Sequence, residues 1–260
     1  MNQSDFVSQT ALLLAAHGER RQDARNEGVL RIARALSDRG LVPELAVGFV
    51  SGVPTIRDAL NALGTRRILV YPLFVSSGYF TRDRLVQLLD EANDQYREIQ
   101  VLPPLGLDPG LPDLVVGFAK QAARERGFAP QLSTVICLAH GSRRNSSSRE
   151  ATEQVVRGVE GRAAFRQVRI AFLEERPFLA EAAKAVSGPI VVVGLFSGEG
   201  MHGARDAPRL TAELGRSDIA FAGVIGSAAG VEELVARSVT EAILRDIHAQ
   251  HCCNASCTGG

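Results

Sequence analysis

The three residues Ala-His-Gly occur twice in this chain, as Ala16-His17-Gly18 and as Ala139-His140-Gly141. Each copy ends a short apolar run and leads into an arginine-containing stretch. A short apolar run that ends at a glycine is typical of a buried strand in a parallel sheet. The two histidines lie 123 positions apart (140 minus 17), so we predict that the chain is an internal duplication.

The same register returns further along the chain. Pro54 and Pro177 each follow a Phe-containing apolar run, again 123 positions apart (177 minus 54). Leu73-Phe74 and Leu195-Phe196 each precede a Ser/Gly stretch, 122 positions apart (195 minus 73). Three matches at nearly one offset indicate two copies of one structural unit.

Each half alternates apolar strand patterns with amphipathic helix patterns, which is typical of a parallel α/β sheet with helices on both faces. In the first half we expect strands at 11–16, 44–50, 67–74 and 99–102, and helices at 23–39, 55–63, 82–96 and 111–126. In the second half we expect strands at 134–139, 167–173, 189–196 and 219–223, and helices at 147–160, 178–186, 205–214 and 230–249.

The predicted fold is therefore α/β, with two tandem doubly wound half-domains and a cleft between them. Residues 1–129 form the first predicted lobe, 130–249 the second, and 250–260 a cysteine-rich tail. The carboxyl ends of the strands in both lobes are expected to point into the cleft, where open α/β sheets bind their ligands.

Composition narrows the classes of partner. The formal net charge is zero, which does not suggest a nucleic-acid-binding protein. No stretch approaches the ~18 to 20 apolar residues of a membrane span, and the first residues, 1–5, lack the pattern of a signal peptide. The four cysteines do not form a disulfide framework, so we expect a cytoplasmic protein. From the zero net charge and the lack of an apolar span, we expect neither nucleic-acid nor membrane partners.

Three strand ends of the second half carry residues that suit metal binding: His140, Glu174 and His202. Loops that follow neighbouring parallel strands can converge on one point, since the strands lie about 4.8 Å apart. Two imidazoles and a carboxylate can bind a divalent metal or accept protons. Glu175 competes with Glu174 for the inward position, because adjacent residues of a strand point to opposite faces.

The first half keeps only one of these residues. His17 matches His140, but Ser51 and Phe80 stand where the second half has Glu174 and His202. If these three positions had only a structural role, we would expect both halves of the duplication to have similar residues there. The asymmetry therefore favours a functional site in the second lobe.

Three short motifs of the second half, His-Gly-Ser-Arg, Phe-Leu-Glu before a proline, and Gly-x-His, follow three successive predicted strands. Together they resemble the class II, ATP-independent chelatases of tetrapyrrole biosynthesis, the sirohydrochlorin cobaltochelatases and ferrochelatases. The chain is similar to the long, internally duplicated form of that family. The match is good only in residues 134–209.

The resemblance implies that His140, Glu174 and His202 bind the incoming divalent metal, which is a substrate (cobalt, iron or nickel), and accept the pyrrole N–H protons. It implies arginine forks for the carboxylates of the macrocycle and an aromatic wall for its face, at Arg143, Arg144, Arg176, Arg205 and Phe80. The protein would act as a monomer or homodimer, with one site per chain. The loop before Pro177 is one residue shorter than the usual family pattern, which leaves the choice between Glu174 and Glu175 open.

Two other functions stay open at this stage. Ala-His-Gly-Glu-Arg is similar to the Arg-His-Gly motif of histidine phosphatases, although neither copy has the preceding arginine. A non-catalytic metal- or tetrapyrrole-binding protein would explain the incomplete first lobe. Metal-dependent turnover of a tetrapyrrole separates the chelatase from both.

The tail offers a second candidate metal site, with three thiols and imidazoles at short spacing: His251, Cys252, Cys253 and Cys257. Such a set could bind a soft metal or, with a fourth ligand, an iron–sulfur cluster. The spacing matches no established zinc or ferredoxin pattern, and a chain end without metal is the alternative.

Overall fold

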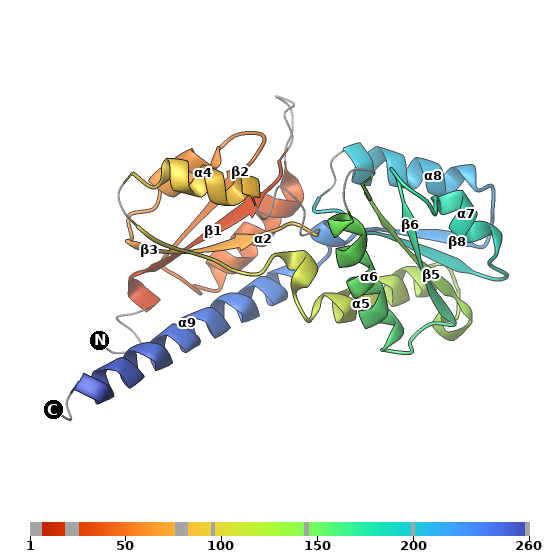
Figure 1. Cartoon of the computed structure of the whole chain (residues 1–260). Helices are drawn as coiled ribbons and strands as arrows, with labels where there is room; N and C mark the ends of the chain where they lie inside the picture. Colours follow the sequence, from red (N-terminus) through yellow and green to blue (C-terminus); the bar gives the residue numbers. More distant parts are fainter. Residues whose placement is uncertain are drawn as a thin grey trace.

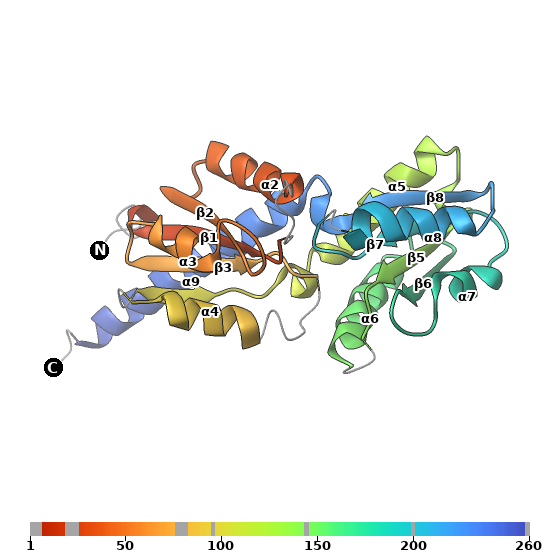
Figure 2. The ribbon, with the colours of Figure 1, turned by 90° about the horizontal axis from the view of Figure 1, so that it is seen from above.

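The computed structural model describes residues 7–18, 26–75, 83–94, 97–142, 146–198 and 201–257, with the backbone alone at 201–202 and 250–257. Two lobes lie side by side, each built around one sheet (Figure 1). The helices lie on both faces of each sheet, as the view from above also shows (Figure 2).

Each lobe contains a four-stranded, all-parallel sheet. The strand orders are β2-β1-β3-β4 and β6-β5-β7-β8, so the second sheet repeats the order of the first. The strands are β1 (Thr10–Ala16), β2 (Glu44–Phe49), β3 (Arg67–Pro72), β4 (Glu98–Val101), β5 (Thr134–Ala139), β6 (Gln167–Phe172), β7 (Ile190–Gly194) and β8 (Ile219–Val224). The predicted α/β fold with two parallel sheets is confirmed.

The helices follow the predicted order. They are α2 (Glu27–Asp38), α3 (Ile56–Asn61), α4 (Leu85–Ala92), α5 (Leu111–Glu125), α6 (Ser147–Glu160), α7 (Leu179–Lys184), α8 (Ala207–Glu213) and α9 (Val231–Cys257), with short turns η2 (Leu105–Leu107), η3 (Pro130–Leu132), η4 (Met201–Asp206) and η5 (Ile225–Ser227). Helix α9 runs past the predicted end at 249, so the backbone at 250–257 continues this helix rather than forming a separate tail. Within the described ranges, no helix is both long and apolar enough to cross a membrane.

The last helix of each half packs on the sheet of the other half. Helix α5 follows β4 but contacts β7 and β8, whereas α9 follows β8 but contacts β3 and α2. Figure 1 shows α9 beneath the first lobe and α5 beneath the second. The spatial lobes therefore differ from the predicted segments 1–129 and 130–249, because each segment gives its final helix to the other sheet.

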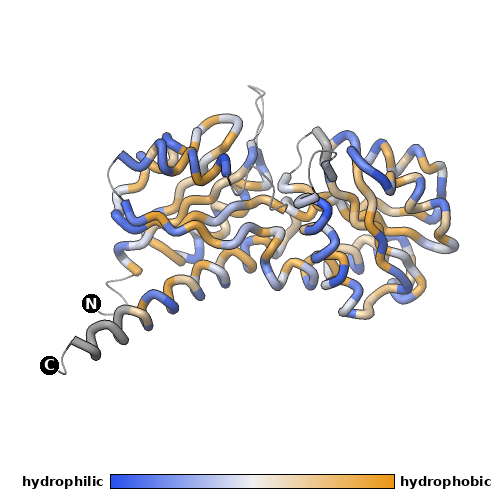
Figure 3. Tube along the Cα trace, in the orientation of Figure 1, coloured by the Kyte–Doolittle hydropathy of each residue, from blue (hydrophilic) through white to orange (hydrophobic). Residues whose placement is uncertain are grey.

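This exchange joins the two lobes through one apolar core. The largest cluster of buried side chains includes residues of both central strands, such as Leu12 and Val135, and of both exchanged helices, such as Val115 and Val235. Two smaller clusters fill the opposite faces of the two sheets. Apolar segments therefore run along the strands and along the sheet-facing sides of the helices in both lobes (Figure 3).

A buried carboxylate fastens α9 to the first lobe. Asp108 Oδ1 accepts hydrogen bonds from Arg237 Nη2 on α9 at 2.6 Å and from the Gly110 amide at 2.8 Å. The Tyr71 hydroxyl on β3 donates to Asp108 Oδ2 at 3.4 Å. Burial, with a smaller effect of the Asp108 carboxylate, raises the pKa of Tyr71, so the phenol keeps its proton and remains a donor. At the corresponding place after η5, the second lobe has the apolar Ala228.

Replacing this carboxylate tests how much α9 depends on it. The Asp108 side chain is only 4% exposed, so Asp108→Ala leaves a guanidinium, an amide and a phenol without their acceptor. We expect a loss of about 3 kcal/mol in the free energy of unfolding, measured by urea denaturation. Asp113→Ala breaks the exposed pair with Arg162 and is the control, with a far smaller expected loss. Equal losses would show that the Asp108 contact does not hold α9 in place.

Candidate functional site

The carboxyl ends of the two sheets meet in the middle of the molecule (Figure 1). The Val75 amide, after β3, donates to the Ser197 Oγ, after β7, at 3.3 Å. A glycine packs under each of these two loops: a Cβ on Gly106 would lie 1.8 Å from the Val75 carbonyl oxygen, and one on Gly226 would lie 2.4 Å from that of Ser197. The segments 19–25, 76–82, 143–145 and 199–200 lie outside the described residues.

His140 and Glu174 lie on two loops that are joined by their backbones. The Glu174 amide donates to the His140 carbonyl at 3.0 Å, and the Leu173 amide donates to the Ala139 carbonyl at 3.0 Å. Both His140 and Glu174 are exposed. The first lobe repeats this bond, from the Ser51 amide to the His17 carbonyl at 2.7 Å. The scaffold is therefore common to both lobes, and the side chains on it differ.

The His140 ring is oriented by its own loop. Its Nδ1 lies 3.1 Å from the Gly141 carbonyl oxygen. Because a carbonyl only accepts, Nδ1 carries the hydrogen in this contact, and in the neutral ring Nε2 would then have the lone pair. A histidine that binds a metal usually donates its other ring N–H to such an acceptor. This arrangement suits either a metal ligand or a proton acceptor.

The two adjacent glutamates, Glu174 and Glu175, have different surroundings in the structure. The Glu175 carboxylate accepts hydrogen bonds from the Ser142 amide at 3.0 Å and from Arg149 Nη2 at 2.7 Å, and its side chain is 18% exposed. Glu174 is exposed instead. The geometry therefore favours Glu174 as the glutamate that faces a ligand.

The remaining predicted residues are only partly described. His202 lies in η4, immediately before α8, and its side chain is outside the described set. Arg205, in the same turn, is exposed. Arg176 is 78% exposed, pairs with Glu181 and lies over the Phe178 ring. Arg143, Arg144 and Phe80 lie outside the described residues.

Among the side chains that the structure describes, no three His, Cys, Asp or Glu residues form a metal-binding group. The side chain of His202, the third predicted ligand, is not in that set. The side chains of His251, Cys252, Cys253 and Cys257 are also outside it, so the second metal site stays a prediction.

Comparison with known proteins agrees with the duplicated fold. The CbiX family model matches the chain twice, over residues 11–122 and 134–242. The chain belongs to the CbiX family. The two matches correspond to the two halves predicted from the Ala-His-Gly repeat.

Several proteins similar to this CbiX-family chain are chelatases by name or description. A protein of Halobacterium salinarum, named probable sirohydrochlorin cobaltochelatase, is 25% identical over 220 residues, which are 76% of this chain and 75% of the relative. A solved CbiX structure, described as the terminal enzyme for siroheme biosynthesis in denitrifying bacteria, has a TM-score of 0.72 at 27% identity and covers 90% of this chain and 99% of its own. SirB from Bacillus subtilis, solved with Fe³⁺, shares the fold with a TM-score of 0.76 at 17% identity, over 90% of this chain and 95% of its own.

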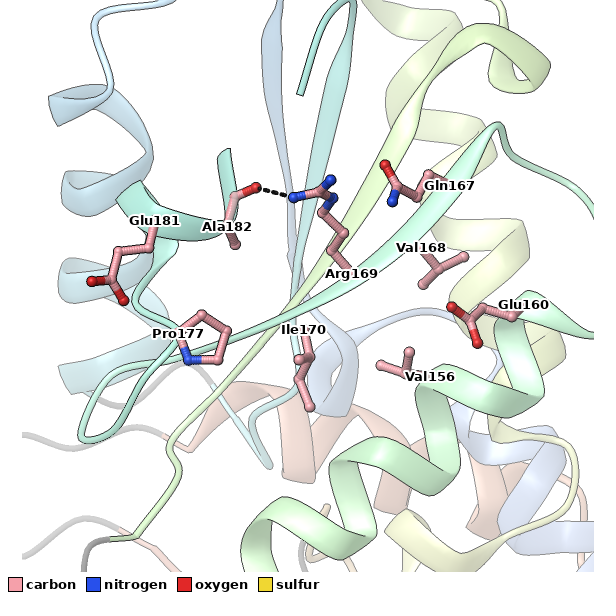
Figure 4. A pocket seen from close by; sticks show the side chains of 9 residues that line it. All are labelled: Val156, Glu160, Gln167, Val168, Arg169, Ile170, Pro177, Glu181 and Ala182. Carbon is pink, nitrogen blue, oxygen red and sulfur yellow. Dashed lines mark hydrogen bonds between the residues drawn. The ribbon is translucent and has the colours of Figure 1, made fainter. Parts of the chain in front are cut away.

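A separate pocket of about 410 Å³ lies along the outer edge of β6, between α6 and α7 (Figure 4). Val156, Val168 and Ile170 supply apolar lining, and Arg169 Nη1 donates to the Ala182 carbonyl at 3.1 Å. The sequence analysis did not anticipate it, since its shape depends on the spacing of two helices. Neither His140 nor Glu174 lines this pocket, so we do not place the chemistry there.

Cys137, in the middle of β5, is a thiol that the site does not use. Burial raises the pKa of Cys137 to about 12. The thiolate is the form that reacts and binds metals, so the folded protein should leave Cys137 unmodified by iodoacetamide up to pH 9. Unfolding in guanidinium should make it reactive at pH 8.5, as peptide mass spectrometry would show. Rapid alkylation in the native state would contradict its burial.

Proposed function

We propose that this chain inserts a divalent metal ion into a sirohydrochlorin-type tetrapyrrole. Membership of the CbiX family and the functions that its relatives' names state support this reaction. The structural observation that carries the proposal is the bond from the Glu174 amide to the His140 carbonyl, which puts two predicted ligands on neighbouring loops at the strand ends.

The proposed chemistry needs two things from the protein. The incoming ion must lose bound water, and two pyrrole N–H protons must leave before the ring nitrogens bind it. His140 Nε2 and the Glu174 carboxylate are ligands that can replace water on the ion and groups that can accept protons. We assign the third ligand to His202, on η4.

Arginines around this site are proposed to bind the carboxylates of the macrocycle. Arg176 and Arg205 are exposed, on the loops that carry Glu174 and His202. A guanidinium can bind a carboxylate with two parallel hydrogen bonds, which orients a flat ring as well as holding it. We propose the same role for Arg143 and Arg144, and a wall position for Phe80.

The metal is the part of the proposal that an assay must decide. We propose cobalt or iron as the natural substrate, with nickel as a third ion to compare. The purified protein is incubated with sirohydrochlorin and each divalent ion under anaerobic conditions, and insertion is followed by visible absorption. Binding of the tetrapyrrole without turnover would favour the non-catalytic alternative, and hydrolysis of phosphate esters would favour a histidine phosphatase.

The two histidines of the repeat give a matched pair of variants. We expect His140→Ala to lower the insertion rate by roughly 10²-fold or more, as for loss of a positioned proton acceptor. His17→Ala should keep most of the activity, because Ser51 occupies the position of Glu174 in its lobe. The measurement is the initial rate with saturating sirohydrochlorin and Co²⁺. Similar losses in both variants would mean that the two lobes contribute ligands to one site.

A further inference from the structure

We propose that Glu175 and Arg149 are positioning residues that fix the two loops of His140 and Glu174 and thereby set the affinity for the metal substrate. This inference rests on the proposed function. It is drawn from a set of contacts that neither the family match nor the two ligand residues require.

The Glu175 carboxylate is shared between the two loops and a helix. Its Oε1 accepts from the Ser142 amide at 3.0 Å, on the loop after β5. Its Oε2 accepts from Arg149 Nε at 3.0 Å and Nη2 at 2.7 Å, on α6. Charge-assisted hydrogen bonds to a mostly buried carboxylate are stronger and more directional than neutral ones. The carboxylate therefore ties the residue after Glu174 to the loop that begins at His140.

Arg149 completes the connection from its other side. Its guanidinium lies 4.5 Å from the centre of the Phe172 ring, the last residue of β6, and Nη2 also donates to the Arg176 carbonyl. Its Nη1 lies 3.8 Å from Glu153, one turn further along α6. The loop after β6 is thus held on both sides of Glu175.

The turn at Gly141 packs closely against the Glu175 side chain and has no space for a Cβ atom. Gly141 has a φ of +75°, and a Cβ there would lie 2.8 Å from Cγ of Glu175 and 3.0 Å from Cβ of Phe172. Glu175 therefore lies against this turn, whereas its neighbour Glu174 is exposed.

The first lobe has the same loop connection without this ion pair. At the repeat offset of 123, Gly52 replaces Glu175 (175 minus 123) and Asn26 replaces Arg149 (149 minus 123). The Ser51 amide still bonds the His17 carbonyl. The fold of the loops thus does not need the pair, and it occurs in the lobe that has both His140 and Glu174.

Binding of Co²⁺ alone to the full-length protein tests the inference. Calorimetry gives the Kd for Co²⁺ in full-length protein with Cys252, Cys253 and Cys257 changed to serine, so that the predicted tail site does not contribute. Thermal unfolding reports any general loss of stability. Glu175→Gln and Arg149→Met should each weaken Co²⁺ binding about tenfold, which is within the range for residues that orient metal ligands. The double variant should lose little more than either single one, because both changes break the same contact. In the insertion assay, the KM for Co²⁺ should rise more than kcat falls.

Asp218→Asn is the matched control, since it breaks the Arg216–Asp218 pair at the other end of the second sheet. It should lower stability without changing the Kd for Co²⁺. Unchanged Co²⁺ binding in both Glu175→Gln and Arg149→Met would overturn the positioning role while leaving the proposed function intact. Unchanged binding in His140→Ala would instead refute the metal site itself. If Glu175→Gln does not fold, Arg149→Met decides the question alone.

Discussion

The tight glycine turn at the end of each central strand is the constraint on which the rest of the site depends. Gly18 and Gly141 have φ values of +72° and +75°, and a Cβ at either place would lie within 3.0 Å of the Phe that ends the neighbouring strand. Only glycine adopts this conformation and fits this space without strain. The close approach lets the histidine loop and the next strand's loop share backbone hydrogen bonds, which hold the two loops side by side.

Duplication and helix exchange fix the positions of the two lobes, and of the loops at their strand ends, relative to one another. Each sheet must bury both faces, and one face of each is covered by the final helix of the other half. The two halves therefore cannot separate without exposing part of a common core. A metal or ring that binds between the strand ends would contact loops from two lobes whose positions are linked by that core.

The Asp108–Arg237 pair of the first lobe and the Glu175–Arg149 pair of the second lie at different places in the fold. In the first lobe, the Asp108–Arg237 pair lies where η2 meets α9 and holds an exchanged helix. In the second lobe, the Glu175–Arg149 pair lies at the carboxyl ends of the strands, beside His140 and Glu174. Burying an ion pair costs solvation, so such pairs bring specificity of arrangement more than stability. The difference is consistent with the proposal that the second lobe carries the metal site.

The sequence by itself determined the strands, their parallel arrangement and the repeat, because apolar runs of strand length leave few alternatives once they must be buried. It also predicted His140, Glu174 and His202 as a set of ligands, from their places after successive strands. Only the tertiary structure showed that Glu175 is paired while Glu174 is exposed, since this depends on Arg149, which is 26 positions away from Glu175 along the chain. The tertiary structure also decided that α5 and α9 each pack on the sheet of the other half. The apolar face of either helix fits both sheets equally well, so the residue pattern does not predict which sheet the helix covers.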